Sequence, residues 1–427
     1  MTAPTADLLD PTSSAYKKAR KRHIKTIKNR RENVEADWTP FRAAEKKYKA
    51  RFPPPDLSHV LDLALADGSR AKEIEMGWWK GRVDAVDVKE IPLKHASGRP
   101  GYVFPDLPGL VLLPRFVTDD TQRELVRWAL HDHARPPNVN NLDTHYVLPP
   151  EGLWNSYISS PDLVIHPVAS SSGRSHEIVV AEPAGPRTLI SNPPASPASF
   201  SSLASEPKPL AAPSTTVLPL STSALLPKLR WANIGWFYHW GTKQYDFTRG
   251  KEPVDPRVRQ VCQNAVSAVP WEVVFESDEA EGWGEDEPDW KRWDETYEPD
   301  AGIVNFYQTK DTLMAHVDRS EVCATSPLVS ISLGNAAVFL IGGLTRDVPP
   351  VPILLRSGDV VIMSGPACRR AYHGVPRILE NTLPSHLHVT SSDEDWTPYA
   401  EYLKSARINV NVRQVFPKGF EPHLENH

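Results

Sequence analysis

The chain has 427 residues, enough for one to three domains with a sizeable core. Its net charge is −5, and no run of about 18 apolar residues occurs, which argues against a membrane-spanning helix. The three cysteines form no C-x-x-C pair, and the first 15 residues lack the apolar core of a secretory signal. We therefore expect a reducing, intracellular compartment; the sequence does not distinguish nucleus, cytoplasm and mitochondrion.

Charge is unevenly distributed along the chain. Residues 1–51 hold 14 Lys/Arg and 6 Asp/Glu, whereas residues 276–300 hold 12 Asp/Glu and 2 Lys/Arg. The basic run KKARKRHIKTIKNRR (17–31) favours contact with phosphate or serves as a nuclear address; a solvated tail is the alternative. We expect residues 1–60 to form a basic, partly helical N-terminal extension.

The first predicted elements are helical. Residues 15–50 are rich in Lys, Arg, Ala and Glu, and the run RFPPPDLSHV (51–60) ends the helix because proline lacks a backbone donor. GLVLLPRF (109–116) predicts a strand. TDDTQRELVRWALHDH (118–133) predicts a helix that is capped at Thr118 or Asp119 and has one apolar face.

Two segments differ from the rest in composition. Residues 168–228 are rich in Pro, Ser and Ala, with 10 prolines in 183–227 and no periodicity. Such a segment buries too little apolar surface to offset its ordering entropy, so we expect a disordered insertion. The acidic, Trp-rich residues 276–300 predict a second, partly ordered insertion.

Short apolar runs separated by Gly, Pro and Asp fill residues 301–375, and this density of strands predicts a sandwich or barrel. One of these runs, LMAHVDRSE (313–321), carries His316 and Asp318 two residues apart. Because side chains at i and i+2 of a strand share a face, these two can bind one metal ion. With His373 as third ligand they would form a 2-His-1-carboxylate Fe(II) site, although an isolated H-x-D pair is common by chance.

The last predicted strand, ARINVNVRQVF (406–416), places Arg407, Asn409 and Arg413 on one face and apolar residues on the other. Two arginines facing a core are costly without an anion, and the guanidinium fork pairs well with carboxylates. An edge strand with its polar face in water is the alternative. An Fe(II) site together with a carboxylate-binding strand predicts a 2-oxoglutarate-dependent dioxygenase.

Five ordered motifs then resemble those of the AlkB family of nucleic-acid dioxygenases. They are Asn305-Phe306-Tyr307, the His316/Asp318 pair nine residues after that tyrosine, SISLGNAAVFLIGG (330–343), SGDVVIMSGPACRRAYHGVPRI (357–378), and the Arg407/Asn409/Arg413 strand. FRAAEKKYKARFPPPDLS (41–58) and LRWANIGWFYHWGTKQYDF (229–247) are similar to the eukaryotic AlkB homologue 1 subfamily, of a fungal type with insertions.

This resemblance implies an α+β, mainly β fold: a double-stranded β-helix (jelly-roll) core with flanking helices, covering residues 100–417 and interrupted by the two insertions. It implies that Fe(II) is bound by His316, Asp318 and His373. It also implies that Arg407 pairs with the distal carboxylate of 2-oxoglutarate, and that the other end of this cosubstrate is held by Asn305, Tyr307, Asn409 and Arg413.

For the substrate, the resemblance points to an aromatic lid and two charged residues. Trp236 and Tyr245 are the stacking candidates in the aromatic run 231–245, although core packing explains most of that run. Arg346 and Glu321 stand where the family contacts the flipped base. Ser320 departs from the acidic residue of the bacterial pattern, which leaves the preferred base open.

The implied reaction is oxidative: O₂ and 2-oxoglutarate at Fe(II) lead to hydroxylation of an N-methyl group, and formaldehyde leaves the bare base. We expect a monomer that acts on nucleic acid, with 1-methyladenosine in tRNA as substrate. N6-methyladenine in DNA is an alternative. A non-catalytic module that keeps the fold and binds nucleic acid or protein, a protein oxygenase, and an iron-independent lyase at abasic sites are competing classes.

Overall fold

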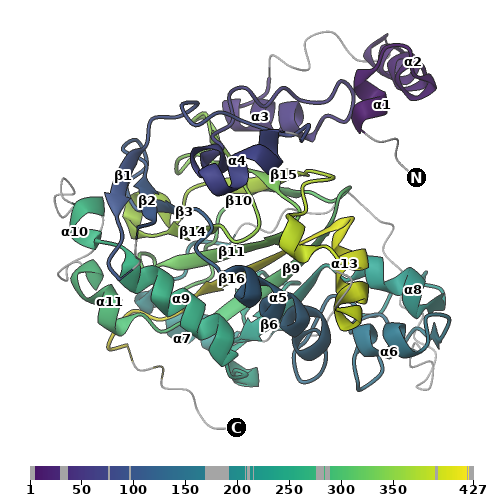
Figure 1. The fold of residues 1–427 in the computed structure, drawn as a ribbon. Coiled ribbons are helices and arrows are strands. Elements are labelled where there is room, and N and C mark those ends of the chain that lie inside the picture. Colours follow the sequence, from purple (N-terminus) through teal and green to yellow (C-terminus); the bar gives the residue numbers. More distant parts are fainter. Residues whose placement is uncertain are drawn as a thin grey trace.

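The computed structural model describes residues 5–28, 37–75, 77–95, 98–168, 192–206, 208, 212–214, 216–275, 283, 289–389, 393–420 and 422. Two antiparallel sheets form its centre (Figure 1). The large sheet has the order β1 (Lys89–Pro92), β2 (Pro100–Val103), β3 (Leu110–Leu113), β14 (Val360–Met363), β11 (Leu328–Gly334), β16 (Ala406–Arg413), β9 (Ala301–Gln308) and β6 (Trp231–Gly235). The small sheet has the order β10 (Leu313–His316), β15 (His373–Ile378), β12 (Ala337–Ile341) and β13 (Val351–Leu355).

Two short hairpins accompany the sheets: β4 (Val164–Ile165) with β5 (Leu220–Ser221), and β7 (Tyr238–His239) with β8 (Gln244–Tyr245). The larger helices are α2 (Ser14–Lys28), α3 (Pro40–Lys49), α4 (Gly68–Glu75), α5 (Asp119–Arg127), α6 (Leu153–Ser159), α9 (Pro256–Ala268) and α13 (Thr397–Leu403). The shorter ones are α1 (Thr5–Leu9), α7 (Phe200–Ser205), α8 (Thr222–Leu225), α10 (Trp271–Val274), α11 (Trp293–Thr296) and α12 (Gly365–Cys368).

The helices cover the outer faces of the two sheets. On β16 the even-numbered residues Ile408, Val410 and Val412 are fully buried and belong to one apolar cluster with residues of α5, α9 and α13. On the far side, Phe41 and Tyr48 of α3 pack with residues of β12. The odd-numbered residues of β16 therefore face the space between the sheets, as the strict alternation of this strand predicts.

Most helices and strands predicted from the sequence are confirmed. The predicted strand at 109–116 is β3, and the predicted helix at 118–133 is α5 followed by a π-helical turn at Trp128–His133. Thr118 caps α5 by accepting from the Thr121 amide at 3.3 Å. The sheet begins before residue 100, because β1 pairs with β2 along its whole length.

The expectation of a disordered insertion at 168–228 is wrong for residues 192–206 and 216–228, while residues 169–191 lie outside the described part. Phe200 is 5% exposed, and its ring lies 5.2 Å from that of Phe247 and 5.4 Å from that of Phe416. Composition suggested disorder because few apolar residues occur here, yet a single aromatic side chain completes a cluster that the rest of the fold supplies. In the acidic segment, Trp293 and Tyr297 are buried, and residues 276–282 and 284–288 lie outside the described part.

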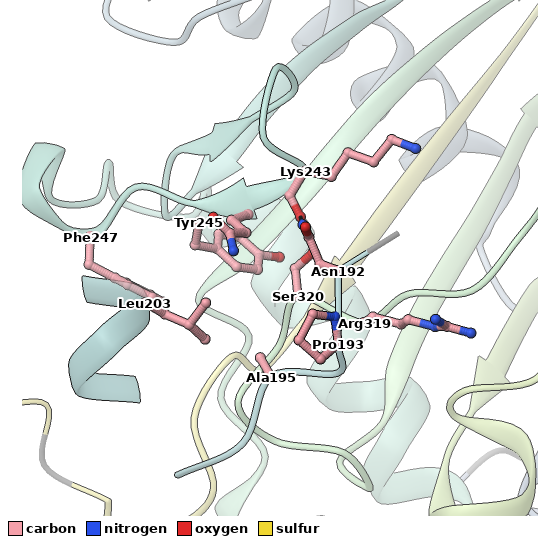
Figure 2. A pocket seen from close by; sticks show the side chains of 10 residues that line it. Asn192, Pro193, Ala195, Leu203, Lys243, Tyr245, Phe247, Arg319 and Ser320 are labelled. Atoms are coloured by element: carbon pink, nitrogen blue, oxygen red, sulfur yellow. Dashed lines mark hydrogen bonds between the residues drawn. The ribbon is translucent and has the colours of Figure 1, made fainter. Parts of the chain in front are cut away.

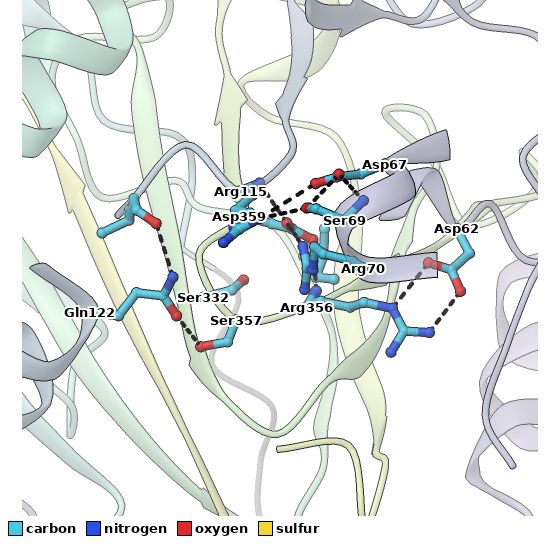
Figure 3. A network of polar contacts seen from close by, with 12 residues as sticks. Asp62, Asp67, Ser69, Arg70, Arg115, Gln122, Ser332, Arg356, Ser357 and Asp359 are labelled. Atoms are coloured by element: carbon cyan, nitrogen blue, oxygen red, sulfur yellow. Dashed lines mark hydrogen bonds and ion pairs between the residues drawn. The ribbon is translucent and has the colours of Figure 1, made fainter. Parts of the chain in front are cut away.

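A buried polar network joins α4 and the residues before it to the turn between β13 and β14 (Figure 3). Arg356 donates to both carboxylate oxygens of Asp62, at 3.1 and 2.7 Å, and both side chains are buried. Arg70 pairs with Asp359 at 3.4 Å in the same network. Because removal of either partner would leave a buried charge unpaired, these pairs fix the N-terminal segment against the core. Among the described residues no helix is long and apolar enough to cross a bilayer.

Acid lability is predicted for the π-helical turn. Burial lowers the pKa of His133 to about 4, and its ring packs against Trp128 in a tilted arrangement with the ring centroids 4.5 Å apart. Between pH 6.5 and 4 the unfolded chain therefore binds a proton that the folded chain does not, so stability falls as the pH falls. We expect the free energy of unfolding of the native protein to fall by about 2 kcal/mol more than that of His133→Gln between pH 7 and pH 5.

Urea denaturation at both pH values measures this difference. His131→Gln is the matched control, because His131 lies two residues away with its side chain 48% exposed. Equal acid sensitivity of the native protein and His133→Gln would show that His133 is not responsible.

Candidate active site

The three predicted metal ligands come together at one edge of the small sheet, beside the paired strands β10 and β15. His316 is the last residue of β10, and His373, the first residue of β15, is its cross-strand partner. Their ring centroids are 4.4 Å apart. Asp318 Oδ1 lies 3.7 Å from His316 Nε2, and one ligand atom from each of the three residues lies within 4.8 Å of the others.

The local geometry of Asp318 differs from the prediction. β10 ends at His316, so Asp318 lies in the following loop and not on the same strand face. Its position depends on a tertiary contact: its outer oxygen, Oδ2, lies 3.4 Å from Arg413 Nη1, at ion-pair distance but without a hydrogen bond. Burial opposes ionisation of Asp318, but Arg413, His373, His316 and Arg369 together outweigh it, and they hold the pKa of this carboxyl well below its usual range.

The histidines are oriented for metal binding. The Nδ1 atom of His316 lies 3.0 Å from the Met314 carbonyl, and the Nδ1 atom of His373 lies 3.0 Å from the Ala371 carbonyl. Nδ1–H donation to these carbonyls leaves Nε2 of each ring as the ligand atom. Burial lowers the pKa of His373 to about 4, which keeps the ring neutral at pH 7. Two imidazoles and one ionised carboxylate fit the ligand set of Fe(II).

The predicted carboxylate-binding residues line the space between the sheets. Arg407 is the cross-strand partner of Tyr307, and Asn409 is the cross-strand partner of Asn305. The Arg407 side chain is 1% exposed, and burial lowers its pKa to about 10, so it remains a cation at pH 7.

Arg407 lacks an anionic partner within the part of the chain that the structure describes. It donates to the Asn335 carbonyl at 3.0 Å and to Ser332 Oγ at 2.7 Å, while its Nε has no hydrogen-bond partner. A buried guanidinium that is held by neutral groups fits an incoming carboxylate, because a fork of N–H donors pairs bidentately with it.

Arg413 lies in a different environment from Arg407. It donates to Glu321 Oε1 at 2.9 Å, besides facing Asp318. Glu321 in turn pairs with Arg369 at 3.3 Å and accepts from the Tyr245 hydroxyl at 3.0 Å. Arg413, Glu321, Arg369 and Tyr245 are buried, and with Asp318 they form one network that links this candidate metal ligand to the β7–β8 hairpin.

This network bears on two predicted substrate contacts. Glu321 is 2% exposed and Tyr245 is 3% exposed, so neither presents a free surface to a base in this conformation. Arg369, which directly follows α12, also belongs to the site. No sequence pattern predicts this, because its contact with Glu321 joins residues 48 apart in sequence.

The other two predicted substrate residues also have structural partners. Trp236 is 7% exposed, packs edge-on against Phe247 at 5.4 Å, and donates from its indole nitrogen to Asp300 at 3.2 Å. Arg346 is exposed, but it donates to the Ala315 carbonyl at 2.9 Å and its guanidinium lies 5.1 Å from the Tyr372 ring. The geometry favours core packing for Trp236, and a base contact by Arg346 stays a prediction.

The exposed ring of the aromatic run is Trp240. It lies between β7 and β8, is 40% exposed, and stacks on Trp231 at 4.9 Å with an interplanar angle of 28°. Tyr238 packs against it edge-on at 5.0 Å. The Tyr238 side chain forms a hydrogen bond with Ser320, so this aromatic group contacts the loop that carries Asp318.

A small cavity lies between the β7–β8 hairpin, residues 192–203 and the loop residues Arg319 and Ser320 (Figure 2). Its volume is about 10 Å³, which is room for about one water molecule. Lys243, Tyr245, Arg319 and Ser320 contribute to its wall. The cavity is therefore a packing gap behind the metal-binding loop and is too small for a nucleobase.

Comparison with known proteins agrees with this geometry. The 2OG-Fe(II) oxygenase superfamily matches residues 203–413. The DNA N(6)-methyladenine demethylase ALKBH1A of Arabidopsis thaliana is 30% identical over 399 residues, which are 90% of this chain and 97% of that protein. The nucleic acid dioxygenase ALKBH1 of Mus musculus is 28% identical, over 87% of this chain and 82% of that protein.

A third relative, the tRNA demethylase abh1 of Schizosaccharomyces pombe, is 28% identical over 88% of this chain and 96% of its own length. These matches extend over nearly the whole chain and include the segment that carries the His316–Asp318–His373 triad. The chain therefore belongs to the AlkB family of dioxygenases, in its homologue 1 subfamily, and is an enzyme that uses Fe(II), 2-oxoglutarate and O₂.

Proposed function

We propose that this enzyme oxidatively demethylates nucleobases, with 1-methyladenosine in tRNA as its substrate. The observation that carries the proposal is the exposed Trp240–Trp231 stack, which Tyr238 connects to the loop of Asp318, because a nucleic-acid enzyme needs an aromatic surface for an unpaired base. When bound, Fe(II) with 2-oxoglutarate and O₂ supplies the oxidation of the N-methyl group, which leaves as formaldehyde. Relatives named as demethylases of tRNA and of DNA support the class of substrate.

In this proposal each set of residues has one role. His316, Asp318 and His373 bind the metal ion, and Arg407 binds the distal carboxylate of 2-oxoglutarate. Asn305, Tyr307 and Asn409 line the same space, and Arg413 holds Asp318 in place. Three odd-numbered positions of β16 (407, 409 and 413), and the β9 residues paired with the first two, thus serve 2-oxoglutarate and the metal site from one rigid surface.

We propose a jelly-roll for the core, corresponding to the dioxygenase domain of residues 100–417. Support comes from the strand order: from β9 to β16 the chain alternates between the two sheets, with β12 and β13 as the one consecutive pair in the small sheet. This gives β14–β11–β16–β9 facing β10–β15–β12–β13, with the triad between them. Residues 1–60 are then an extension that reaches the small sheet through α3.

The test is product formation with matched substrates. Succinate and formaldehyde are measured for a tRNA stem-loop with 1-methyladenosine, for the same stem-loop without the methyl group, and for a DNA duplex with N6-methyladenine. Formaldehyde from the methylated stem-loop alone is the expected result. If formaldehyde forms from the DNA alone, N6-methyladenine in DNA is the substrate instead. The name of the Arabidopsis relative supports this alternative. Formaldehyde from methylated peptides instead would overturn the nucleic-acid proposal.

Replacing Trp240 is expected to weaken binding of the nucleic acid. Stacking of one base on an aromatic ring contributes about 1–3 kcal/mol, so Trp240→Ala should raise Kd for the stem-loop about tenfold. Fluorescence anisotropy measures the change. Trp78→Ala is the matched control, since Trp78 is 60% exposed but lies far from the triad in sequence and outside the aromatic hairpin. An equal increase in Kd for the stem-loop in both variants would indicate a non-specific effect.

The basic helix α2 is expected to bind phosphates. It carries seven Lys/Arg and no Asp/Glu, and none of its side chains is buried. Tyr16 and His23 pack edge-on against Phe52, which attaches the helix to the chain beyond α3. Changing Lys17, Lys18, Lys21 and Lys25 to Gln should raise Kd for tRNA about tenfold and make the dependence of log Kd on log salt shallower by about 2–3. An unchanged slope would assign α2 to another role, such as an address signal.

A further inference from the structure

Residues 192–200, within the Pro/Ser-rich segment 168–228, contact the loop that carries the metal ligand Asp318. We call them the strap segment. The Ala195 amide donates to the Arg319 carbonyl at 2.8 Å, and the Ala195 carbonyl accepts from Arg370 Nη2 at 2.7 Å. Arg319 directly follows Asp318, and Arg370 precedes His373 by three residues. One residue of the strap segment therefore bridges the two chain segments that supply metal ligands.

The strap segment also binds the β7–β8 hairpin (Figure 2). Asn192 Nδ2 lies 2.7 Å from the Thr242 carbonyl and 3.3 Å from the Lys243 carbonyl. Lys243 has a φ of 55°, a left-handed conformation that a residue with a side chain adopts at a cost. Ser320 Oγ donates to the same Lys243 carbonyl at 2.9 Å. Asn192 and Ser320 thus hold the hairpin turn from two sides.

Phe200 anchors the strap segment at its other end. Its ring contacts those of Phe247, Phe416 and Phe420 at 5.2, 5.4 and 5.2 Å, so the segment is fixed to residues that follow the hairpin and to residues that follow β16. An aromatic anchor that is 5% exposed contributes far more burial than the small residues around it. Phe200 therefore helps to fix the backbone of residues 192–199 next to the β7–β8 hairpin and the loop of Asp318.

We propose that the strap segment is a positioning element of the active site, which holds the β7–β8 hairpin against the metal-binding loop in the conformation that receives the nucleic-acid strand. Residues 317–321 form neither helix nor strand, so their order depends on side-chain and inter-segment bonds of this kind. A surface that is ordered before binding loses less conformational entropy on binding, which favours affinity. The part of this inference that concerns substrate affinity rests on the proposed function; the ordering of the hairpin and loop does not.

The test compares Asn192→Ala with Ser201→Ala, an exposed position on α7 just past the strap segment. Hydrogen exchange of peptides covering residues 238–245 and 317–321 is measured in the full-length protein. One hydrogen-bonding side chain is lost, so we expect about fivefold faster exchange in Asn192→Ala and no change in Ser201→Ala. KM for the methylated stem-loop should rise about fivefold in Asn192→Ala and stay at the native value in Ser201→Ala.

Phe200→Ala is the second variant and should accelerate exchange in the same two peptides by removing the anchor. Native exchange rates in both peptides for both variants would overturn the proposal. Faster exchange with an unchanged KM would overturn its functional half and leave a purely structural strap. If the native enzyme shows no stimulation by any methylated nucleic acid, the proposed function fails, and hydrogen exchange alone still decides whether the strap segment orders the site.

Discussion

Asp318→Ala should abolish turnover, with succinate formation falling at least about a hundredfold. The carboxylate does two things in this fold: Oδ1 faces His316, and Oδ2 lies 3.4 Å from Arg413. Its loss leaves two neutral imidazoles beside a buried guanidinium, and that positive charge opposes binding of a dication. Fe(II) affinity should therefore fall more than the loss of one ligand bond alone would cause.

Fe(II) binding by equilibrium dialysis and succinate formation measure the two effects separately. Asp318→Asn keeps the volume of the side chain but not its charge, and should lose turnover to a similar extent. Asp347→Ala, at an exposed position between β12 and β13, is the matched control and should behave as the native protein. Native Fe(II) affinity in Asp318→Ala would mean that the carboxylate is not a ligand.

Arg407→Ala should raise KM for 2-oxoglutarate at least about a hundredfold, because a buried bidentate ion pair loses one partner. Arg407 is suited to this role because it has no anionic partner: its hydrogen bonds within the described chain go to the neutral groups of Asn335, Ser332 and Leu355. Fe(II) affinity should stay near the native value, since the triad does not include this side chain. This separation distinguishes the cosubstrate-binding role from a general collapse of the site.

Succinate formation as a function of 2-oxoglutarate concentration gives the comparison. Arg407→Lys keeps the charge without the planar fork and should lie between the native protein and Arg407→Ala. Arg82→Ala removes an exposed arginine that is paired with Asp84, and should change nothing. A native KM in Arg407→Ala would assign the carboxylate to another cation, with Arg413 as the first candidate.

Much of the site was predictable because it depends on strand periodicity. The inward orientation of Arg407, Asn409 and Arg413 follows from a period of two, and β16 alternates without a bulge along its pairing with β9. The pairing of His316 with His373 could be inferred from the family motif alone, because the residues are 57 positions apart. The position of Asp318 was wrong in detail, since the strand ends two residues earlier.

The buried network around Glu321 was not predictable. Glu321 is an acidic residue shortly after Asp318, which suggested a contact with the base. The structure instead places Glu321 between Arg369, Arg413 and Tyr245. Glu321, Arg369 and Arg413 are all buried, and a buried charge without a partner is costly. The carboxylate therefore pairs with both guanidinium groups. Sequence gives the charges, but not which of them share a low-dielectric environment.

By itself, the sequence determined the local features: the extended strands, the alternation of polar and apolar faces, a helix cap at Thr118 or Asp119, and the residue types of the triad and of the carboxylate-binding strand. These depend on neighbours within a few residues, so periodicity and side-chain chemistry report them. Only the tertiary structure decided that Trp236 is core and Trp240 is exposed, and that part of a Pro/Ser-rich segment is ordered. Those outcomes depend on burial against distant residues, where a single anchor such as Phe200 outweighs the composition of its own segment.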